Sequence, residues 1–145
     1  MVTVQELLAR KGSHVITVGA DATVLDAALV MNEHRVGAVV VVEEGKIQGM
    51  FTERDVLRRV VGERRDPTQT VVSEVMTRDV FCCTPQTGLE EARGTMKNRR
   101  IRHLPVVDGD NRLLGLISIG DLNAHEATAQ EQTIHLLQEY LYGRV

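Results

Sequence analysis

The sequence contains two copies of one pattern, and this internal repeat limits the possible folds more than any other feature. The stretch that begins at Val15 aligns with the stretch that begins at Val80 at an offset of 65 residues, which becomes 66 after one extra residue near Asn111. Each copy predicts a strand, a helix, two strands joined by a tight turn and a final helix. Identical aligned pairs include Val15/Val80, Ala27/Ala92, Met31/Met96, Arg35/Arg100, Val41/Val106, Val42/Val107, Gly49/Gly115 and Asp55/Asp121.

Two such units together make a stable module, because one β-α-β-β-α unit does not easily bury both faces of its small sheet. The sequence therefore predicts an α/β (α+β) fold of two pseudo-symmetric repeats. Thr3 and Glu6 form a capping-box signature for a short N-terminal helix. The C-terminal segment predicts an amphipathic helix. Its apolar face could pack on its own module or on a neighbouring molecule, and the sequence leaves both alternatives open. The predicted segments are the first repeat at 13–62, a polar linker at 63–73, the second repeat at 74–125 and the C-terminal helix at 126–145.

Several element boundaries follow from local signals. First strands are expected at Val15–Val18 and Val80–Cys83, and Thr87 with Glu90 forms a capping-box signature for the first helix of the second repeat. The final helix of the second repeat is expected to be short, to begin at Ser118 and to be separate from the C-terminal helix.

Composition and charge exclude several classes of protein. The net charge of −3 and the 3% content of aromatic residues argue against nucleic-acid binding. The sequence has no apolar run of transmembrane length and no signal-peptide pattern at its beginning, so we expect a cytoplasmic protein without a membrane partner. Cys82 and Cys83 are adjacent and are expected to be small hydrophobic residues in a reducing compartment rather than a disulfide.

The sequence also lacks the usual signatures of catalysis. It has no nucleophile elbow, no P-loop, no dinucleotide fingerprint and no zinc-protease helix, and its 5 histidines are scattered without metal-ligand spacing. The two repeats use nearly the whole chain. We therefore expect no enzyme, no catalytic residue and no metal site.

Two phrases in each copy resemble the CBS-domain family, which is named after cystathionine β-synthase. In the second copy they are IRHLPVVD at Ile101–Asp108 and GLISIGDL at Gly115–Leu122, with weaker counterparts at Val36–Glu43 and Gly49–Val56. The resemblance covers residues 13–124, and the layout resembles small stand-alone bacterial CBS-pair proteins. It implies that the two repeats form one module, that clefts between them hold adenosyl ligands, and that modules commonly form flat homodimers.

The pattern G-x-x-[ST]-x-x-D occurs once in each repeat and suits a nucleotide. Thr52 with Asp55, and Ser118 with Asp121, should lie where a strand passes into a helix. A carboxylate there accepts hydrogen bonds from both ribose hydroxyls, and the exposed N–H groups of the helix start favour phosphate. The alternative is purely structural, because the same residues form a helix N-cap.

The resemblance extends the candidate site beyond this phrase. It implies that Arg102 and His103 face phosphates, and arginine suits phosphate because its guanidinium is a planar fork of donors. The second repeat keeps RHLPV, so we expect the preferred adenosine site around Asp121 and a second one around Asp55. The expected site residues are Ser118, Ile119, Gly120, Asp121, Arg102, His103, Leu104, Pro105, Cys83 and Thr84 in the first, and Thr52, Arg54, Asp55, Val18, Gly19, Val39 and Val40 in the second.

The functional hypothesis is a regulatory module that binds an adenine nucleotide and signals its presence to an unknown partner protein. AMP is the first choice of ligand, and NAD(H), ADP, ATP and S-adenosylmethionine share the same adenosine chemistry. The alternative is a structural dimerisation protein without a working nucleotide pocket. A more distant alternative is nucleic-acid binding through Arg99–Arg102.

Overall fold

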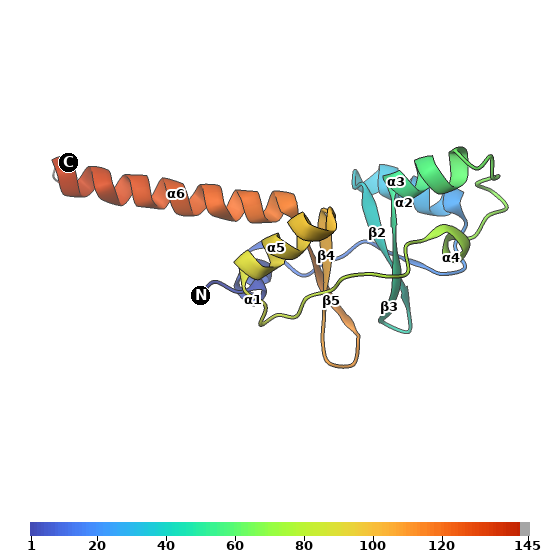
Figure 1. The fold of residues 1–145 in the computed structure, drawn as a ribbon, viewed down its shortest axis with the longest axis horizontal. Helices are drawn as coiled ribbons and strands as arrows, with labels where there is room; N and C mark the ends of the chain where they lie inside the picture. Colours follow the sequence, from blue (N-terminus) through green and yellow to red (C-terminus); the bar gives the residue numbers. More distant parts are fainter. Residues whose placement is uncertain (143–145) are drawn as a thin grey trace.

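The two repeats lie side by side in the computed structural model, which describes residues 1–142, and one long helix extends away from them (Figure 1). The predicted β-α-β-β-α order is confirmed in the first repeat, and the helices at the two ends of the chain are present. The first repeat consists of β1 (Thr17–Gly19), α2 (Val24–His34), β2 (Ala38–Glu43), β3 (Lys46–Thr52), α3 (Glu53–Asp55) and the π-helical turn η1 (Val56–Val61). The remaining elements are α1 (Val4–Lys11), α4 (Val72–Val75), α5 (Leu89–Arg99), β4 (His103–Val107), β5 (Leu113–Ser118) and α6 (Ile119–Tyr142).

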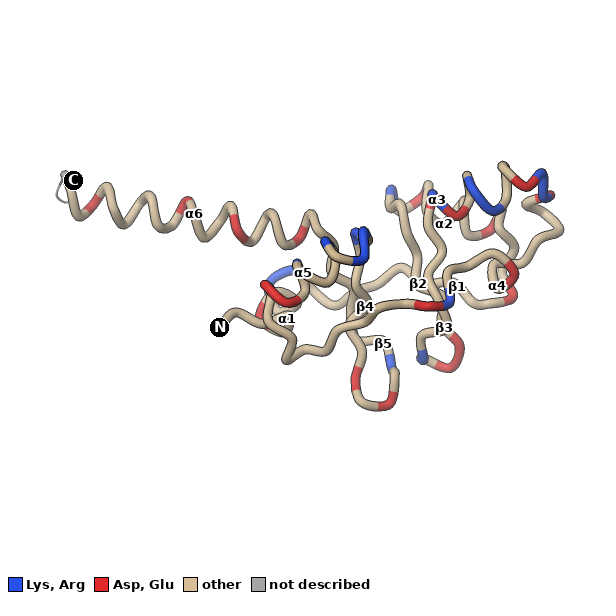
Figure 2. Tube along the Cα trace, viewed as in Figure 1, with Lys and Arg blue, Asp and Glu red and all other residues tan. Residues whose placement is uncertain are grey.

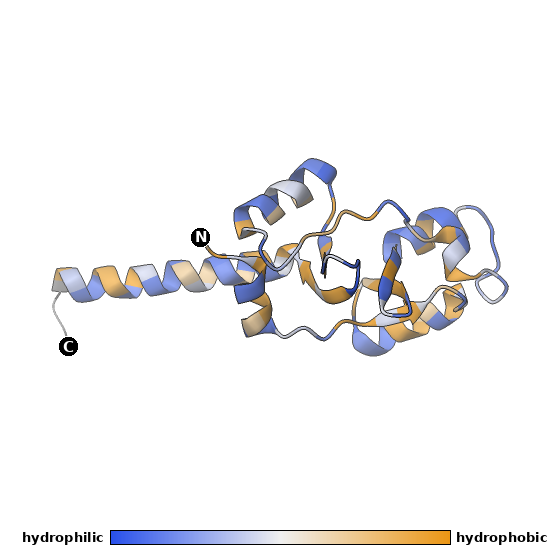
Figure 3. Cartoon of the chain, turned by 90° about the horizontal axis from the view of Figure 1, so that it is seen from below, coloured by the Kyte–Doolittle hydropathy of each residue, from blue (hydrophilic) through white to orange (hydrophobic). Residues whose placement is uncertain are grey.

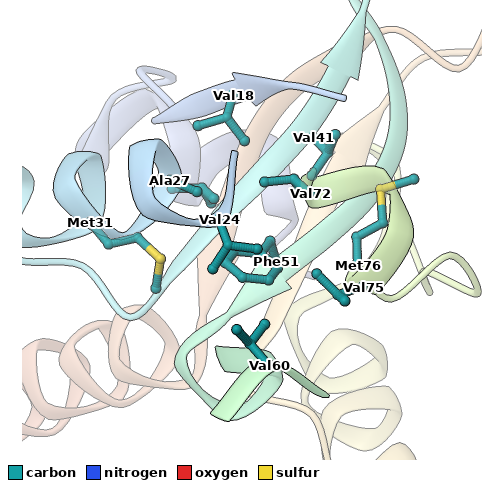
Figure 4. Close-up of a cluster of buried hydrophobic side chains, with 11 residues drawn as sticks. Val18, Val24, Ala27, Met31, Val41, Phe51, Val60, Val72, Val75 and Met76 are labelled. Carbon is teal, nitrogen blue, oxygen red and sulfur yellow. The ribbon is translucent and has the colours of Figure 1, made fainter. Parts of the chain in front are cut away.

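Strand β2 is the centre of the first repeat. It pairs in parallel with β1 and antiparallel with β3. Its run of valines is buried because both faces of the strand are covered. Val39 and Val41 belong to a cluster that includes Phe51, which is fully buried, and residues of α2 and η1 (Figure 4). Ala38 and Val40 face the other way, and join a cluster with Val107 of the second repeat that binds the two repeats together.

The second repeat has the same plan with a reduced first strand. Strands β4 and β5 pair antiparallel, and of the predicted strand Val80–Cys83 only Cys83 pairs, as an isolated parallel bridge to Val106. The chain turns just before this point, since the Val80 N–H donates to the carbonyl of Arg78 at 2.9 Å. This turn prevents a longer strand.

The predicted capping box at Thr87 and Glu90 is wrong. Helix α5 begins after Gly88, which has no side chain to cap it, and the Thr87 hydroxyl accepts a hydrogen bond from the Thr84 N–H instead. In the first repeat, the position aligned with Gly88 is Thr23, and Thr23 caps α2. The difference between Thr23 in the first repeat and Gly88 in the second therefore leaves α5 without a side-chain N-cap.

Each repeat is completed by a helix that precedes the other repeat in the sequence. Helix α1 contributes Val4 and Leu7 to the core of the second repeat, whereas α4 contributes Val72 and Val75 to the core of the first. The hydropathy colouring shows the apolar interior of each half (Figure 3). This exchange joins the two repeats into one unit.

The aligned glycines Gly49 and Gly115 make the exchange possible. A Cβ atom on Gly49 would lie 2.7 Å from the carbonyl oxygen of Thr77, and one on Gly115 would lie 2.9 Å from Leu8 of α1. The segment that precedes one repeat therefore passes directly over a strand of the other. At Gly49 only glycine leaves room for the backbone of Thr77, whereas at Gly115 a larger residue would have to displace the Leu8 side chain.

The two helices predicted after Ser118 are a single helix, α6, of 24 residues. Leu122 is buried, and Arg93 of α5 forms an ion pair with Glu126 at 3.1 Å. No residue between Ser118 and Glu126 breaks the helix, so the predicted separation was wrong. The large apolar residues beyond this point are exposed, and the last residues of the predicted segment 126–145 lie outside the described residues. The exposed residues include Ile134, Leu136, Leu137, Tyr140 and Leu141.

Among residues 1–142, no helix combines the length and the apolar character that crossing a membrane requires.

Candidate functional site

A cavity of about 270 Å³ lies between the two repeats, next to Asp55. We call it the Asp55 cavity. One wall comes from the end of β3 and the start of α3, and the other from the chain before the second repeat and the chain that leads into β4. Its lining residues are Gly37, Met50, Thr52, Glu53, Arg54, Asp55, Thr77, Asp79, Val80, Phe81, Arg100, Ile101, Arg102 and His103.

The carboxylate of Asp55 is held in place by several donors. Its Oδ2 atom accepts hydrogen bonds from the Thr52 N–H at 3.0 Å and the Thr52 hydroxyl at 3.2 Å, and the Thr77 hydroxyl donates to Oδ1 at 3.3 Å. The Thr52 hydroxyl also accepts a bond from the Asp55 N–H at 3.3 Å, which completes a capping box. Arg59 Nε lies 3.6 Å from Oδ1. The pair therefore does cap a helix, and its carboxylate also borders the cavity.

Asp121 has the same cap and a different partner. The Ser118 N–H donates to Oδ2 at 2.8 Å, and the Asp121 N–H donates to the Ser118 hydroxyl at 3.1 Å. The ammonium group of Lys11, at the end of α1, forms an ion pair with the same Oδ2 at 2.5 Å. Burial raises the pKa of Asp121, but the bonds from Lys11 and Ser118 outweigh it and leave the pKa below its usual range. This carboxylate is already neutralised from within the chain.

Basic residues gather at one edge of the molecule. The chain leading into β4 and the start of α3 bring Arg100, Arg102 and Arg54 to the Asp55 cavity, and Figure 2 shows basic segments near these positions. Arg100 ends α5 in the left-handed conformation, with a φ of 54°. Its aligned counterpart Arg35 does the same at 55°. The local turn, which is uncommon for a residue with a side chain, directs the chain back toward the cavity edge.

His103 lies between the two candidate sites. Burial lowers its pKa, as do the nearby charges of Lys11 and Arg102, while Asp121 and Glu53 act in the opposite direction. Its imidazole is therefore neutral at pH 7. A neutral imidazole retains one donor and one acceptor nitrogen for a ligand.

The structure brings together five of the residues expected from the sequence and leaves the others outside the Asp55 cavity. The five are Thr52, Arg54, Asp55, Arg102 and His103. Ser118 and Asp121 form the Lys11-bound pair, with Ile119 and Gly120 in the same helix start. Gly19 and Thr84 are exposed. The remaining expected site residues belong to the core: Val18, Val39, Val40, Leu104, Pro105 and Cys83 are all buried.

The thiol of Cys83 is unreactive in this position. Burial raises its pKa to about 12, with smaller contributions from the neighbouring Cys82 and Glu91. Burial also raises the pKa of Cys82, and both cysteines are free thiols. At pH 7 neither is a thiolate, so the pair lacks the form that attacks disulfides or binds metals.

Sequence reasoning missed one wall of the cavity. Thr77, Asp79, Val80 and Phe81 line this wall, and neither the repeated phrases nor the family resemblance marked them as site residues. Arg100, which was not among the expected nucleotide-site residues, also lines the cavity. Its identity with Arg35 in the repeat alignment was the one available signal.

Comparisons with known proteins agree with the fold. The CBS domain family model matches residues 4–62 and 72–127. The CBS domain-containing protein YhcV of Bacillus subtilis is 41% identical over 114 residues, which cover 79% of this chain and 80% of the relative.

Solved structures share the whole arrangement. A CBS-domain-containing protein from Agrobacterium tumefaciens is 39% identical, with a TM-score of 0.79 over 86% of this chain and 99% of the other. A CBS domain protein from Pyrobaculum aerophilum, solved in complex with AMP, has the same fold at 24% identity, with a TM-score of 0.74 over 83% of this chain and 89% of the other. The two regions matched by the family model include α1 and α4, the helices exchanged between the repeats. Together these regions cover most of the described structure. The chain is a member of the CBS domain family.

Proposed function

We propose that this chain is a regulatory module that binds an adenine nucleotide in the Asp55 cavity. The observation that carries the proposal is the cavity itself, because it combines a buried carboxylate with three arginines at one opening between the repeats. AMP is the first choice of ligand, with NAD(H), ADP, ATP and S-adenosylmethionine as further candidates. The complex of the Pyrobaculum aerophilum relative with AMP supports this choice.

The groups around Asp55 match the two ends of a nucleotide. Two of the donors on its carboxylate are the hydroxyls of Thr52 and Thr77, and hydroxyl hydrogens rotate. Their rotation frees acceptor positions for the ribose diol. Arg54, Arg100 and Arg102 supply charge for the phosphate, and Val80 and Phe81 supply apolar surface for the base.

A direct hydrogen bond connects the cavity to the long helix. The carbonyl of Arg102 accepts a bond from the N–H of Ile119, the first residue of α6, at 2.9 Å. A ligand that moves Arg102 therefore acts on the start of α6. We propose α6 as the element whose position reports the ligand to a partner, which requires that the ligand bind one position of α6 more tightly than another.

We also propose that the module forms a homodimer. The apolar residues of α6 beyond Ala127 are exposed, and one helical stripe contains Ile134, Leu137 and Leu141. A second copy would cover this stripe.

Replacing the carboxylate of Asp55 tests the site. Asp55→Asn keeps an oxygen that accepts the capping bond from Thr52 but removes the charge, so the helix start is preserved. Each charge-assisted hydrogen bond contributes about 1.5–3 kcal/mol, and we expect AMP to bind roughly 10- to 100-fold more weakly. Isothermal titration calorimetry gives the affinity, and thermal-shift titrations compare AMP, ADP, ATP, NAD(H) and S-adenosylmethionine.

Asp26→Asn is the matched control. Asp26 is also the acidic residue of a capping box, with Thr23, but it does not line the cavity. It should leave the AMP affinity unchanged. The alternative function, a structural dimerisation protein, is favoured by the capping geometry of both acidic residues, and it predicts that none of the five ligands raises the melting temperature of the wild-type chain.

A further inference from the structure

Lys11 is bound where the second ribose would be expected to bind. Its ammonium group donates to Asp121 Oδ2 and to the carbonyl of Leu116, both at 2.5 Å. The side chains of Lys11 and Asp121 are 31% and 24% exposed, so the pair is partly shielded from water. The Ser118 N–H binds the same Oδ2, so the two bonds fill the acceptor positions of this oxygen. A ribose diol therefore cannot bind both carboxylate oxygens while the ammonium is in place.

The position of Lys11 follows from how α1 is anchored. Leu8 packs on Gly115 of β5, where a Cβ atom would lie 2.9 Å from it. Lys11 is three residues further along, on the same face of α1. The helix packing therefore directs the ammonium toward the end of β5, where Leu116 and Asp121 accept its hydrogen bonds.

The first repeat has no such cation in the aligned position. Met76 lies 65 residues after Lys11, and its side chain is buried in the core of the first repeat. The next residue, Thr77, donates a neutral hydrogen bond to Asp55. Asp55 also has a cation nearby, because Arg59 Nε of the same repeat lies 3.6 Å from its Oδ1. Asp121 differs in that its cation is in hydrogen-bond contact and comes from the segment that precedes the other repeat.

We propose that Lys11 determines how many nucleotides the module binds, by closing the ribose position at Asp121 and leaving the one at Asp55 open. The inference rests on the proposed function and adds the reason for its asymmetry. A nucleotide that reaches Asp121 must first displace the ammonium. The chain is therefore a one-site module, in which the ammonium of Lys11 competes with a ribose for Asp121.

The test is the binding stoichiometry of Lys11→Met with AMP, measured by isothermal titration calorimetry on the full chain. Methionine keeps an unbranched side chain that is one atom shorter, and it removes the charge. We expect one AMP per wild-type chain and two per K11M chain. The second AMP should bind K11M at least about tenfold more tightly than it binds the wild-type chain, which is the factor for one charge-assisted hydrogen bond.

Three further variants locate the sites. K11M/D121N should return to one AMP, because the newly opened site is lost. K11M/D55N should also bind one AMP, now at Asp121. Arg10→Met, which removes the neighbouring exposed cation, should remain at one. Lys11→Gln repeats the test with a polar side chain if K11M is poorly folded.

The outcomes separate the two proposals. One AMP in both K11M and K11Q, or two in the wild-type chain, would overturn the role of Lys11 while the nucleotide function stands. No binding to the wild-type chain together with one AMP on K11M would overturn the Asp55 site and retain Lys11. If no variant binds AMP or any of the other four ligands, both proposals fail.

Discussion

Asp55 and Asp121 occupy the same position in the two repeats, yet their carboxylates have different partners. Both cap a helix through the Ser or Thr three residues earlier. The sequence phrase therefore has a structural role in both copies, and it predicted the position of each carboxylate. It did not predict the accessibility of either one, because Lys11 and Thr77 reach the carboxylates from other parts of the chain.

His103 should make the stability of the protein depend on pH. Its folded-state pKa is lowered, so its neutral form stabilises the fold fully above the unfolded pKa of about 6.5, and this contribution is lost as the pH falls through the folded pKa. We expect His103→Gln to lose less stability than the wild type between pH 7.5 and pH 5. Urea denaturation at a series of pH values measures the difference.

The exposed His14 provides the comparison for this prediction. His14→Gln should follow the wild-type pH dependence. Parallel curves for the wild type and His103→Gln would show that burial of His103 has no effect on stability.

At the scale of elements, the fold depends on helices that exchange partners. The capping-box signature of Thr3 and Glu6 predicted a helix near the N-terminus, and Val4 and Leu7 lie on one face of it. Such local signals predict the helix, but they do not predict which part of the protein packs against its apolar face. The partner of α1 is the core of the second repeat, about 80 to 120 residues away in the sequence, and only the packed structure reveals it.

Shortening Leu7 tests the importance of this contact. Leu7 is 5% exposed, and Leu7→Ala should lower the free energy of unfolding by about 2–4 kcal/mol through lost burial and a residual cavity. Gln5→Ala, at an exposed position of the same helix, should change it by less than about 0.5 kcal/mol. Equal effects in urea denaturation would place α1 outside the cooperative core.

At the scale of the whole molecule, the repeats are similar in plan and different in detail. The duplication in the sequence predicted that two repeats form one module. The G-x-x-[ST]-x-x-D phrase predicted the wall of the cavity that Thr52 and Asp55 form. The wall at Thr77–Phe81, which the sequence did not predict, follows from the way the start of the second repeat crosses the first. Met50 and Thr77 exchange backbone hydrogen bonds there at 2.8 and 2.9 Å. Backbone hydrogen bonds of this kind do not depend on which side chains the two residues carry. The local sequence therefore does not predict that Met50 and Thr77 pair.

The exposed stripe of α6 should control the oligomeric state. Leu137 is 53% exposed, and we expect Leu137→Glu to convert the proposed dimer to a monomer, because a buried charge without a partner is strongly unfavourable. Analytical ultracentrifugation over a range of concentrations measures the change. Gln132→Glu adds the same charge on the opposite face of the helix and should leave the dimer intact. A wild-type monomer at all concentrations would contradict the proposal.

The exchange of helices also sets an order of events during protein synthesis. Helix α1 emerges from the ribosome before either repeat, but its apolar neighbours Ile117 and Leu122 are made only with the last part of the second repeat. At ordinary rates of translation the two are separated by roughly ten seconds. During that interval the first repeat already has α4 in reach, whereas Val4 and Leu7 have no native surface to cover them. Helix α1 is therefore made before both repeats but is among the last parts to reach its place, and Lys11 meets Asp121 only when the second repeat is complete.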